Sequence, residues 1–386
     1  MSKLRKDSLD IKNVLGFALM ARTFLMMIGY ISYALSANKN PVGDLKFDPK
    51  YFFQAITALN YSDVTWYLQI ANDGYTVKPF SVVEKANWAF YPLWPMAMRL
   101  GSFLTGGNTF VAGLILANLI FLIAIVYLYK LINIDFSKKI AYLATILVII
   151  FPASYFYSRP GPESLFLLLN VLSLFFAKKD RWFWAGLYAG LATVTRLQGI
   201  LLLFPLLFIY YQQYRQKKSH NINALSLLLV PIFYTLFLLH LYSITGNFLA
   251  SFGIQQTWDS RLEFPFKAMI QFVLSPNFIS YYGWDLSPVS FLFMILGTAL
   301  VIAIARSPKI PKEYLIYTVL HLFLILARNN LQGTLRFMLP IFPLYIAIAL
   351  SIERRKTWYD VTFYGFIALQ TAYFIAFINQ YNFAHT

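Results

Sequence analysis

The 386-residue chain contains no cysteine, and this absence excludes disulfides, thiolate metal sites and cysteine nucleophiles. Histidine is scarce as well. The four histidines are scattered and form no HExxH or paired metal-binding spacing. The sequence also has no Gly-rich phosphate loop and no nucleotide fingerprint. These absences disfavour a thiol enzyme, a metalloenzyme and an enzyme that uses a nucleotide-linked sugar.

Charged residues are few, at 12% of the chain, against roughly 25% in soluble domains. Apolar residues make up 59%, which is more than one soluble core could hide. The composition therefore predicts an all-α polytopic membrane protein. A net charge of +16 would suggest nucleic acid binding in a soluble protein. Here the basic residues lie between apolar runs, so we expect anionic membrane lipids as partners and no nucleic acid.

The apolar runs predict about 11 transmembrane helices within a single domain spanning residues 1–386. Several runs are shorter than the roughly 20 residues of a full span, which predicts tilted, broken or re-entrant helices. The predicted helices are 14–37, 109–131, 139–157, 163–177, 182–195, 198–214, 223–244, 286–306, 313–327, 334–351 and 357–380.

Basic residues predict a cytoplasmic N-terminus, because Lys3, Arg5, Lys6 and Lys12 precede the first run. The turns that fall on the same side are short and basic in every case, and the C-terminus is then outside. A cleaved signal peptide over 1–37 is the alternative. It is disfavoured because the apolar stretch is long and contains an arginine. A compact chain of this kind favours a prokaryotic plasma membrane.

Two long segments, 38–108 and 245–285, fall on the outer side, where we therefore expect the active face. Within the first, 88–104 is apolar but short and is broken by Pro92 and Pro95. It predicts an interfacial helix on the outer leaflet. The second segment is rich in aromatic and polar residues, namely Gln255, Gln256, Trp258, Asp259, Arg261, Tyr281, Tyr282, Trp284 and Asp285.

Residues 61–75 predict a short helix that begins at Ser62 or Asp63 and ends at Gly74. Asp63 has two interpretations. It is either an N-cap, a position that Asp favours, or a carboxylate that accepts a proton from an attacking hydroxyl. Asp73 is expected to be a helix-end or turn residue.

Glu163 follows a proline-rich break between two predicted spans. It either favours the N-terminus of the next helix through the helix dipole, or lines a cavity overlooked by Asp63 and orients a sugar or a basic residue there. Arginines gather at loop–helix junctions on the same side, where each either snorkels to the interface or clamps a lipid phosphate. They are Arg159, Arg196, Arg328 and Arg336. Arg22, within the first span, has three open roles: an ion pair, a headgroup contact or snorkelling.

The order of these segments resembles the GT-C glycosyltransferases, and most closely the PIG-V-type mannosyltransferases and their bacterial relatives. Two departures stand beside the match. The family usually has Trp before the Asp, where this chain has Ser62, and relatives often have Pro where this chain has Leu197. The matching segments are 63–75, 89–95, 151–166, 195–199 and 336–344.

The resemblance implies a GT-C fold whose large first outer loop carries a catalytic Asp, which falls on Asp63. It implies inverting transfer of mannose from a polyprenyl- or dolichyl-phosphate donor to a hydroxyl of a lipid or glycan acceptor. A monophosphate leaving group does not demand a metal, so no obligatory metal or other cofactor is expected. Arg196 and Arg336 first, then Arg159 and Arg328, would hold the donor phosphate. The substrate cavity would be lined by Glu163, Trp66, Tyr67, Gln198 and Trp258.

The main rival is a lipid-linked sugar flippase or transporter without transferase chemistry. A transporter predicts repeat symmetry and ionisable residues near the membrane midplane. The sequence shows neither clearly, and its long loops all fall on one side. A third possibility is a GT-C enzyme of another branch that modifies protein or lipid A-like acceptors.

Overall fold

The computed structural model describes residues 2–37, 48–218, 220–278 and 286–383. Across these residues every regular element is an α-helix or a 3₁₀-helix, apart from one isolated antiparallel bridge between Leu262 and Arg328. The predicted all-α class is therefore confirmed.

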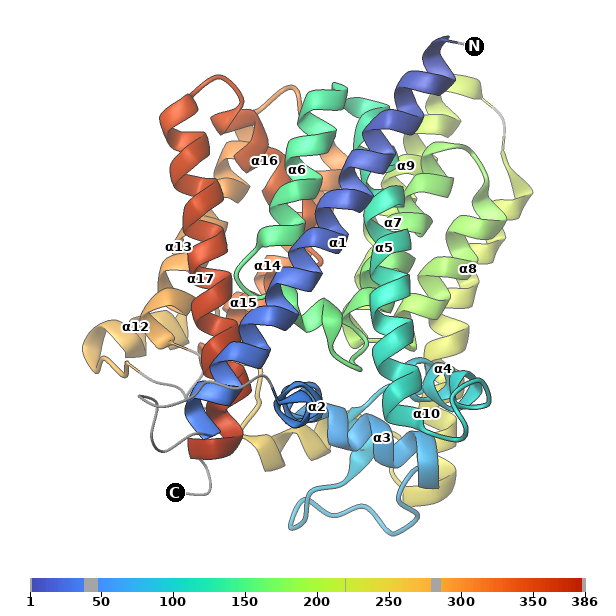
Figure 1. Cartoon of the computed structure of the whole chain (residues 1–386). Helices are drawn as coiled ribbons and strands as arrows, with labels where there is room; N and C mark the ends of the chain where they lie inside the picture. Colours follow the sequence, from blue (N-terminus) through green and yellow to red (C-terminus); the bar gives the residue numbers. More distant parts are fainter. Residues whose placement is uncertain (1, 38–47, 219, 279–285, 384–386) are drawn as a thin grey trace.

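Each of the predicted apolar runs contains a helix, and Figure 1 shows these helices packed side by side in one bundle. Five stretches are long and apolar enough to cross a membrane, namely Asp10–Ser36, Thr109–Asp135, Ile222–Thr245, Ser287–Arg306 and Lys356–Asn379. The other helices are shorter, so the number of crossings stays a prediction. The bundle consists of α1 (Ser2–Ala37), α5 (Thr109–Asp135), α6 (Lys138–Ile150), α7 (Glu163–Lys178), α8 (Trp182–Thr193), α9 (Leu203–Lys217), α10 (Leu229–Thr245), α13 (Ser287–Arg306), α14 (Lys312–Leu326), α16 (Phe342–Ile352) and α17 (Lys356–Phe383).

Two predicted spans are broken where proline interrupts them. The run 139–157 divides into α6 and the 3₁₀-helix η2 (Ser154–Ser158), with Pro152 in the break. The run 334–351 divides into α15 (Thr334–Met338) and α16, with Pro340 in the break. Proline lacks a backbone N–H and restricts the residue before it, so it ends a helix at these points. Both breaks lie beside the candidate site described below.

The segment 38–108, called the first outer loop after its predicted side, contains α2 (Pro49–Thr57), α3 (Asp63–Asp73), η1 (Asn87–Ala89) and α4 (Leu93–Ser102). Figure 1 shows α2, α3 and α4 lying across one end of the bundle. The short helix predicted within 88–104 is present as α4. Its Trp94 is fully buried and donates from Nε1 to the Pro160 carbonyl over 3.0 Å. This contact fastens the loop to the α6–α7 connection.

The second outer loop contains α11 (Ala250–Gly253), η5 (Ile254–Trp258) and α12 (Lys267–Leu274). Its middle pairs with the end of α14, because the Glu263 amide donates to the Ala327 carbonyl over 2.7 Å. The Phe266 amide donates to Leu326 over 3.0 Å. The loop is thereby tied to the segment that leads into α15. Of the residues singled out in this loop, Tyr281, Tyr282, Trp284 and Asp285 lie outside the described residues.

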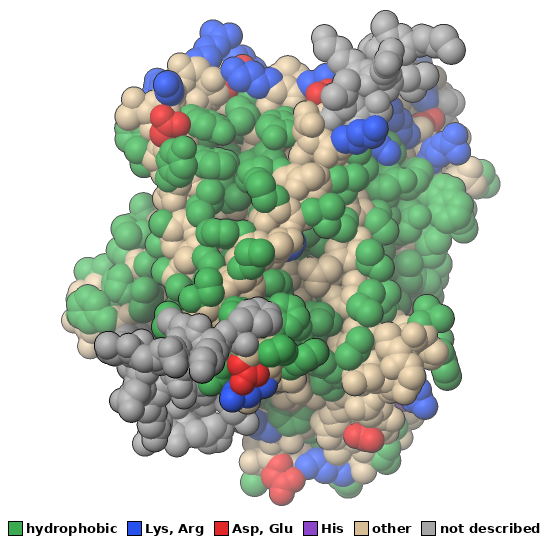
Figure 2. Space-filling model, in the orientation of Figure 1, with side chains coloured by type: hydrophobic (Ala, Val, Ile, Leu, Met, Phe, Trp, Pro, Cys, Tyr) green, Lys and Arg blue, Asp and Glu red, His purple; other side chains and the backbone are tan. Residues whose placement is uncertain are grey.

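The two ends of the bundle differ in character. α1 begins at one end, whereas α17 finishes at the other, beside the last turns of α1 (Figure 1). In Figure 2, hydrophobic side chains cover the sides of the bundle and Lys and Arg gather at the end where α1 begins. An apolar belt between polar ends is the surface of a multi-pass membrane protein. The first outer loop and the described part of the second lie at the end opposite the basic one.

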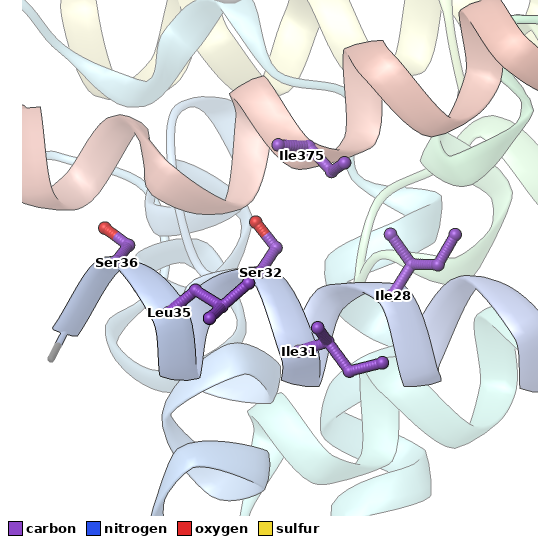
Figure 3. Close-up of a pocket in the computed structure, with 6 residues that line it drawn as sticks. All are labelled: Ile28, Ile31, Ser32, Leu35, Ser36 and Ile375. Atoms are coloured by element: carbon purple, nitrogen blue, oxygen red, sulfur yellow. The ribbon is translucent and has the colours of Figure 1, made fainter. Parts of the chain in front are cut away.

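A groove of about 510 Å³ runs between α1 and α17 (Figure 3). Its lining is apolar except for two serines, and Asn379 donates to the Ser32 hydroxyl beside it over 2.6 Å. No ionisable side chain lines this groove, so it lacks the groups for acid–base or phosphate chemistry. The lining residues are Ile28, Ile31, Ser32, Leu35, Ser36 and Ile375.

Candidate active site

Asp63 is the first residue of α3, and its side chain turns away from the helix end. Ser62 occupies the N-cap position with φ of +63°, and its side chain makes no capping hydrogen bond. The prediction that Gly74 ends the helix is confirmed, because Gly74 is the C-cap with φ of +86°. The N-cap interpretation of Asp63 is wrong. Its carboxylate, 36% exposed, points instead to an arginine on α15.

Arg336 joins the two carboxylates of the site. Its Nη1 lies 2.5 Å from Asp63 Oδ2, and its Nε and Nη2 lie 2.7 Å and 2.5 Å from Glu163 Oε1. The Arg336 side chain is only 12% exposed. Gly333, with φ of +69°, begins the turn that aims α15 at the site. A planar guanidinium with several donors suits this bridging position.

Glu163 begins α7 and is almost fully buried, at 3% exposure. Arg196, from the connection between α8 and η3 (Leu197–Leu202), donates to Glu163 Oε1 over 3.1 Å. A Cβ on Gly161 would collide with this carboxylate, so glycine leaves room for it. A buried carboxylate requires such partners, because an unpaired charge there is costly. Glu163 therefore orients two basic residues, as one of its two interpretations predicts.

Arg159 is 2% exposed and belongs to the same cluster. Its Nε donates to the Leu59 carbonyl over 3.4 Å, and its Nη2 donates to the Tyr61 carbonyl. Its guanidinium lies 4.9 Å from the ring centre of Phe156 and 4.5 Å from that of Phe377. Burial, followed by the charge of Arg336, lowers the pKa of Arg159 to about 10. Arg159 remains charged at neutral pH.

The cluster combines two carboxylates with three guanidiniums and therefore has a net charge of +1. Burial by itself would raise the pKa of Asp63, but Arg336, through its charge and its hydrogen bond, lowers it below the usual value. Arg159 and Arg196 add to the lowering. The Asp63 carboxyl is therefore ionised at neutral pH and can accept a proton.

Arg328 lies beside this cluster, on the other side of Phe337. Its guanidinium is 4.4 Å from the Phe337 ring centre, and that of Arg196 is 5.4 Å from the same ring. Arg328 Nη1 donates to the Gln332 carbonyl within the turn before α15. The structure thus gathers all four predicted outer-face arginines near one another, three of them around the carboxylates.

The predicted aromatic residues Trp66, Tyr67 and Trp258 form a cluster with Phe90 beside α3. Trp66 stacks on Phe90 with ring centres 5.9 Å apart and an interplanar angle of 14°. Trp258 meets Trp66 edge-on at 5.6 Å, which joins the second outer loop to the first. Tyr67 is buried against Phe90, and burial raises the pKa of its phenol. Gln198 is half-buried in η3, two residues after Arg196.

Two polar residues serve this region in ways that the sequence does not indicate. Asn87 is fully buried, accepts from the Thr76 amide over 3.0 Å and donates to the Gly74 carbonyl over 3.2 Å. It thereby folds the loop after α3. Arg22 donates to the Ser154 carbonyl over 2.9 Å and to its hydroxyl over 2.7 Å. None of the three roles considered for Arg22 includes this contact, which fixes the start of η2.

Among the described residues, no three or more His, Cys, Asp or Glu side chains are grouped in a way that could hold a metal ion. Asp63 and Glu163 face arginines instead. The arrangement is suited to proton acceptance at Asp63 and to binding an anion near the guanidiniums.

Comparisons with known proteins point to one class. The family model for dolichyl-phosphate-mannose-protein mannosyltransferase matches residues 89–242. ArnT from Cupriavidus metallidurans, solved bound to undecaprenyl phosphate, is similar in structure with a TM-score of 0.53 and 14% identity over 91% of this chain and 62% of ArnT. The apo oligosaccharyltransferase of Archaeoglobus fulgidus gives a TM-score of 0.47 and 13% identity over 94% of this chain and 56% of that protein.

The chain therefore spans less than two thirds of these solved relatives, and no curated protein matches it. The family-model match and the likeness to ArnT agree with the resemblance found in the motifs, and at 14% identity what ArnT shows of this chain is the GT-C fold. The resemblance found in the motifs is confirmed at that level. The PIG-V-like subtype stays a prediction.

Proposed function

We propose that this protein transfers a hexose, with mannose as the first candidate, from a polyprenyl-phosphate carrier to a hydroxyl of a lipid or glycan acceptor. The observation that carries the proposal is the cluster of Asp63, Glu163, Arg196 and Arg336 at the loop-bearing end of the bundle. This end would face the outside of a prokaryotic plasma membrane, with the N-terminus in the cytoplasm. The PIG-V-like subtype belongs to the same proposal.

Asp63 is the proposed general base. It is ionised and partly exposed, so an acceptor hydroxyl can approach it while it stays in place. As the acceptor oxygen forms its bond to C1 of the sugar, the bond between C1 and the phosphate oxygen breaks. The hydroxyl proton passes to Asp63, and the polyprenyl phosphate leaves with the electron pair. A single displacement of this kind inverts the configuration at C1.

Arg196 and Arg336 are the proposed phosphate ligands. A sugar linked to a lipid through one phosphate is a diester with one negative charge, which matches the net charge of +1 that the two carboxylates and the three guanidiniums, Arg159 included, have together. The leaving monoester gains negative charge as the bond breaks, so preorganised guanidiniums stabilise the transition state more than the ground state. Arg328, one ring away, is a further candidate for the phosphate.

The comparisons support the donor and the sugar in this proposal. The matching family model is named for dolichyl-phosphate-mannose-dependent transfer, and ArnT was solved with a polyprenyl phosphate. Trp66, Tyr67, Gln198 and Trp258 are the proposed cavity residues, together with Glu163. One face of Trp66 is already stacked on Phe90, so sugar contact would use the remaining edges and faces of this cluster.

The test is sugar transfer by the purified protein in nanodiscs, supplied with labelled polyprenyl-phosphate mannose and a total lipid extract. Asp63→Asn should lower the turnover number by about 10²-fold or more, because it removes the proton acceptor. Donor binding should change little, because Arg336 keeps its bonds to Glu163. Asp73→Asn is the matched control, since Asp73 is an exposed carboxylate at the other end of α3.

Equal turnover by Asp63→Asn and the wild-type protein would remove Asp63 as the base. Movement of the labelled donor across the bilayer without any labelled product, in both proteins, would favour the flippase reading over the transferase. Product from the wild type and Asp73→Asn only would support the enzyme class, the donor and the base together.

A further inference from the structure

The backbone directly before Asp63 adopts a strained conformation. Ser62 has φ of +63° and ψ of −134°, a combination that residues with a side chain rarely adopt. Such a conformation is costly and persists only where surrounding contacts over-determine it. The position and direction of Asp63 therefore depend on whatever holds the peptide groups on either side of Ser62.

Arg159 holds them from a distant part of the chain. It donates to the carbonyls of Leu59 and Tyr61, which lie three residues and one residue before Ser62. The Tyr61 carbonyl belongs to the peptide bond that links Tyr61 to Ser62. The two hydrogen bonds therefore fix the chain on the approach to α3.

The Arg159 guanidinium is itself locked in place. It lies over the rings of Phe156 from η2 and Phe377 from α17, at 4.9 Å and 4.5 Å from their centres. These two rings meet each other edge-on with centres 6.0 Å apart, so the guanidinium rests against a corner of aromatic side chains that limits its rotation. η2 is anchored in turn by Arg22 from α1, through Ser154. The Arg336 guanidinium lies 4.9 Å from the centre of the same Phe156 ring, so both arginines contact one side chain.

We infer that Arg159 is a positioning residue that sets the place of Asp63 and is not a ligand of the donor phosphate. The inference deepens the proposed transferase function and rests on it. Its geometry supports this role: the side chain is 2% exposed, and its Nε and Nη2 donate to backbone carbonyls of the segment that leads to the base. A phosphate that drew the guanidinium away from these carbonyls would release the segment that leads to the base.

Arg159→Lys separates the two roles. Lysine keeps the charge, but its single ammonium cannot reproduce the planar fork that reaches both carbonyls. We expect the turnover number to fall about 10- to 100-fold, since small misplacements of a reacting group have effects of that size. The dissociation constant for labelled polyprenyl-phosphate mannose should stay within about twofold. Arg196→Lys is the comparison, and there donor binding should weaken.

Two further measurements keep the inference independent of the proposed function. Hydrogen exchange followed by mass spectrometry should show faster exchange at residues 59–66 in Arg159→Lys, whether or not the protein transfers sugar. If Arg159→Lys does not fold, Phe377→Leu is the second variant, because it removes one of the two rings that contact the guanidinium and keeps the guanidinium itself. Exchange at residues 59–66 should then be faster, with a smaller loss of turnover.

Ser62→Gly supplies a rescue, because glycine adopts φ of +63° without the steric cost. Added to Arg159→Lys, it should recover part of the lost turnover, whereas a phosphate ligand would not be replaced this way. Weakened donor binding by Arg159→Lys with unchanged exchange at 59–66 would overturn the inference. Unchanged turnover and exchange would overturn it as well. A wild-type protein that transfers no sugar would count against the proposed function alone.

Discussion

Asp63 shows how much a single side chain depends on residues far away in the sequence. A carboxylate at the start of a short helix is compatible with a cap and with a base, and both interpretations use the same local pattern. The cap is excluded by the structure, because Ser62 is the N-cap and Arg336, 273 positions further along the chain, holds the carboxylate at 2.5 Å; the base stays a proposal. Glu163 keeps both of its interpretations, since it lies in the first turn of α7 and also pairs with the arginines that reach it from η3 and α15.

The pH dependence of stability follows from the lowered pKa of Asp63. A carboxyl whose pKa is lower in the folded state contributes stability above its unfolded pKa of about 4, and this contribution is lost as the pH falls through the folded value. Asp63→Asn lacks the contribution and leaves three guanidiniums facing one carboxylate. We therefore expect its melting temperature to lie below that of the wild type at pH 7.

The gap between the two melting temperatures should stay constant from pH 7 to about pH 5 and close below about pH 4. Differential scanning fluorimetry in detergent, with Asp73→Asn run in parallel, would measure it. A gap that widens on acidification would contradict the assigned direction of the pKa shift.

The helices themselves follow closely from local sequence. Apolar runs gave helices, prolines broke them, and Gly74 ended α3, because each of these effects acts within a turn or two. The contacts between helices were not foreseeable in this way. Lys178 at the end of α7 pairs with Asp135 at the end of α5 and with Glu313 at the start of α14, and the sequence places these residues far apart. Such a tie fixes three helix ends together.

Glu313→Gln should therefore destabilise the bundle without touching the candidate site. Glu313 and Lys178 are both buried, at 5% and 9% exposure, and loss of a hydrogen bond to a charged group costs about 1.5–3 kcal/mol. The readout is the free energy or the midpoint of unfolding in mixed detergent micelles, with sugar transfer measured on the folded fraction. Glu84→Gln is the control, because the Glu84 side chain is 75% exposed and its pair with Lys78 is worth little. Equal stability of both variants would show that the buried tie contributes nothing.

The predicted orientation of the molecule in the membrane can be tested by thiol labelling, because the chain has no cysteine of its own. The thiol of Glu84→Cys, in the first outer loop, should react in intact cells with a maleimide that does not cross membranes. The thiol of Lys217→Cys, at the far end of α9, should react only after permeabilisation. Both positions are exposed and hold only surface ion pairs, so substitution is tolerated. The reverse labelling pattern would invert the assigned topology.

Composition and hydropathy alone determined the class of this protein: a multi-pass bundle with basic turns at one end and long loops at the other. These properties are summed over many residues, so an error of a few positions in a predicted helix boundary does not alter them. Spacing within short motifs also identified Asp63, Glu163 and the arginines as candidates. No motif pointed to Asn87 or to the contact between Arg22 and Ser154, because lone polar residues without a pattern look alike.

Only the tertiary structure decided which candidates meet. It brought Asp63, Glu163 and three arginines into one cluster of net charge +1, and it turned Arg159 toward the backbone before α3. The reason is physical. Buried charges at a membrane surface are stable only when their partners are near, and those partners come from α3, α7, α15 and the connection before η3. Pairings between elements that far apart in sequence depend on the packing of the complete bundle.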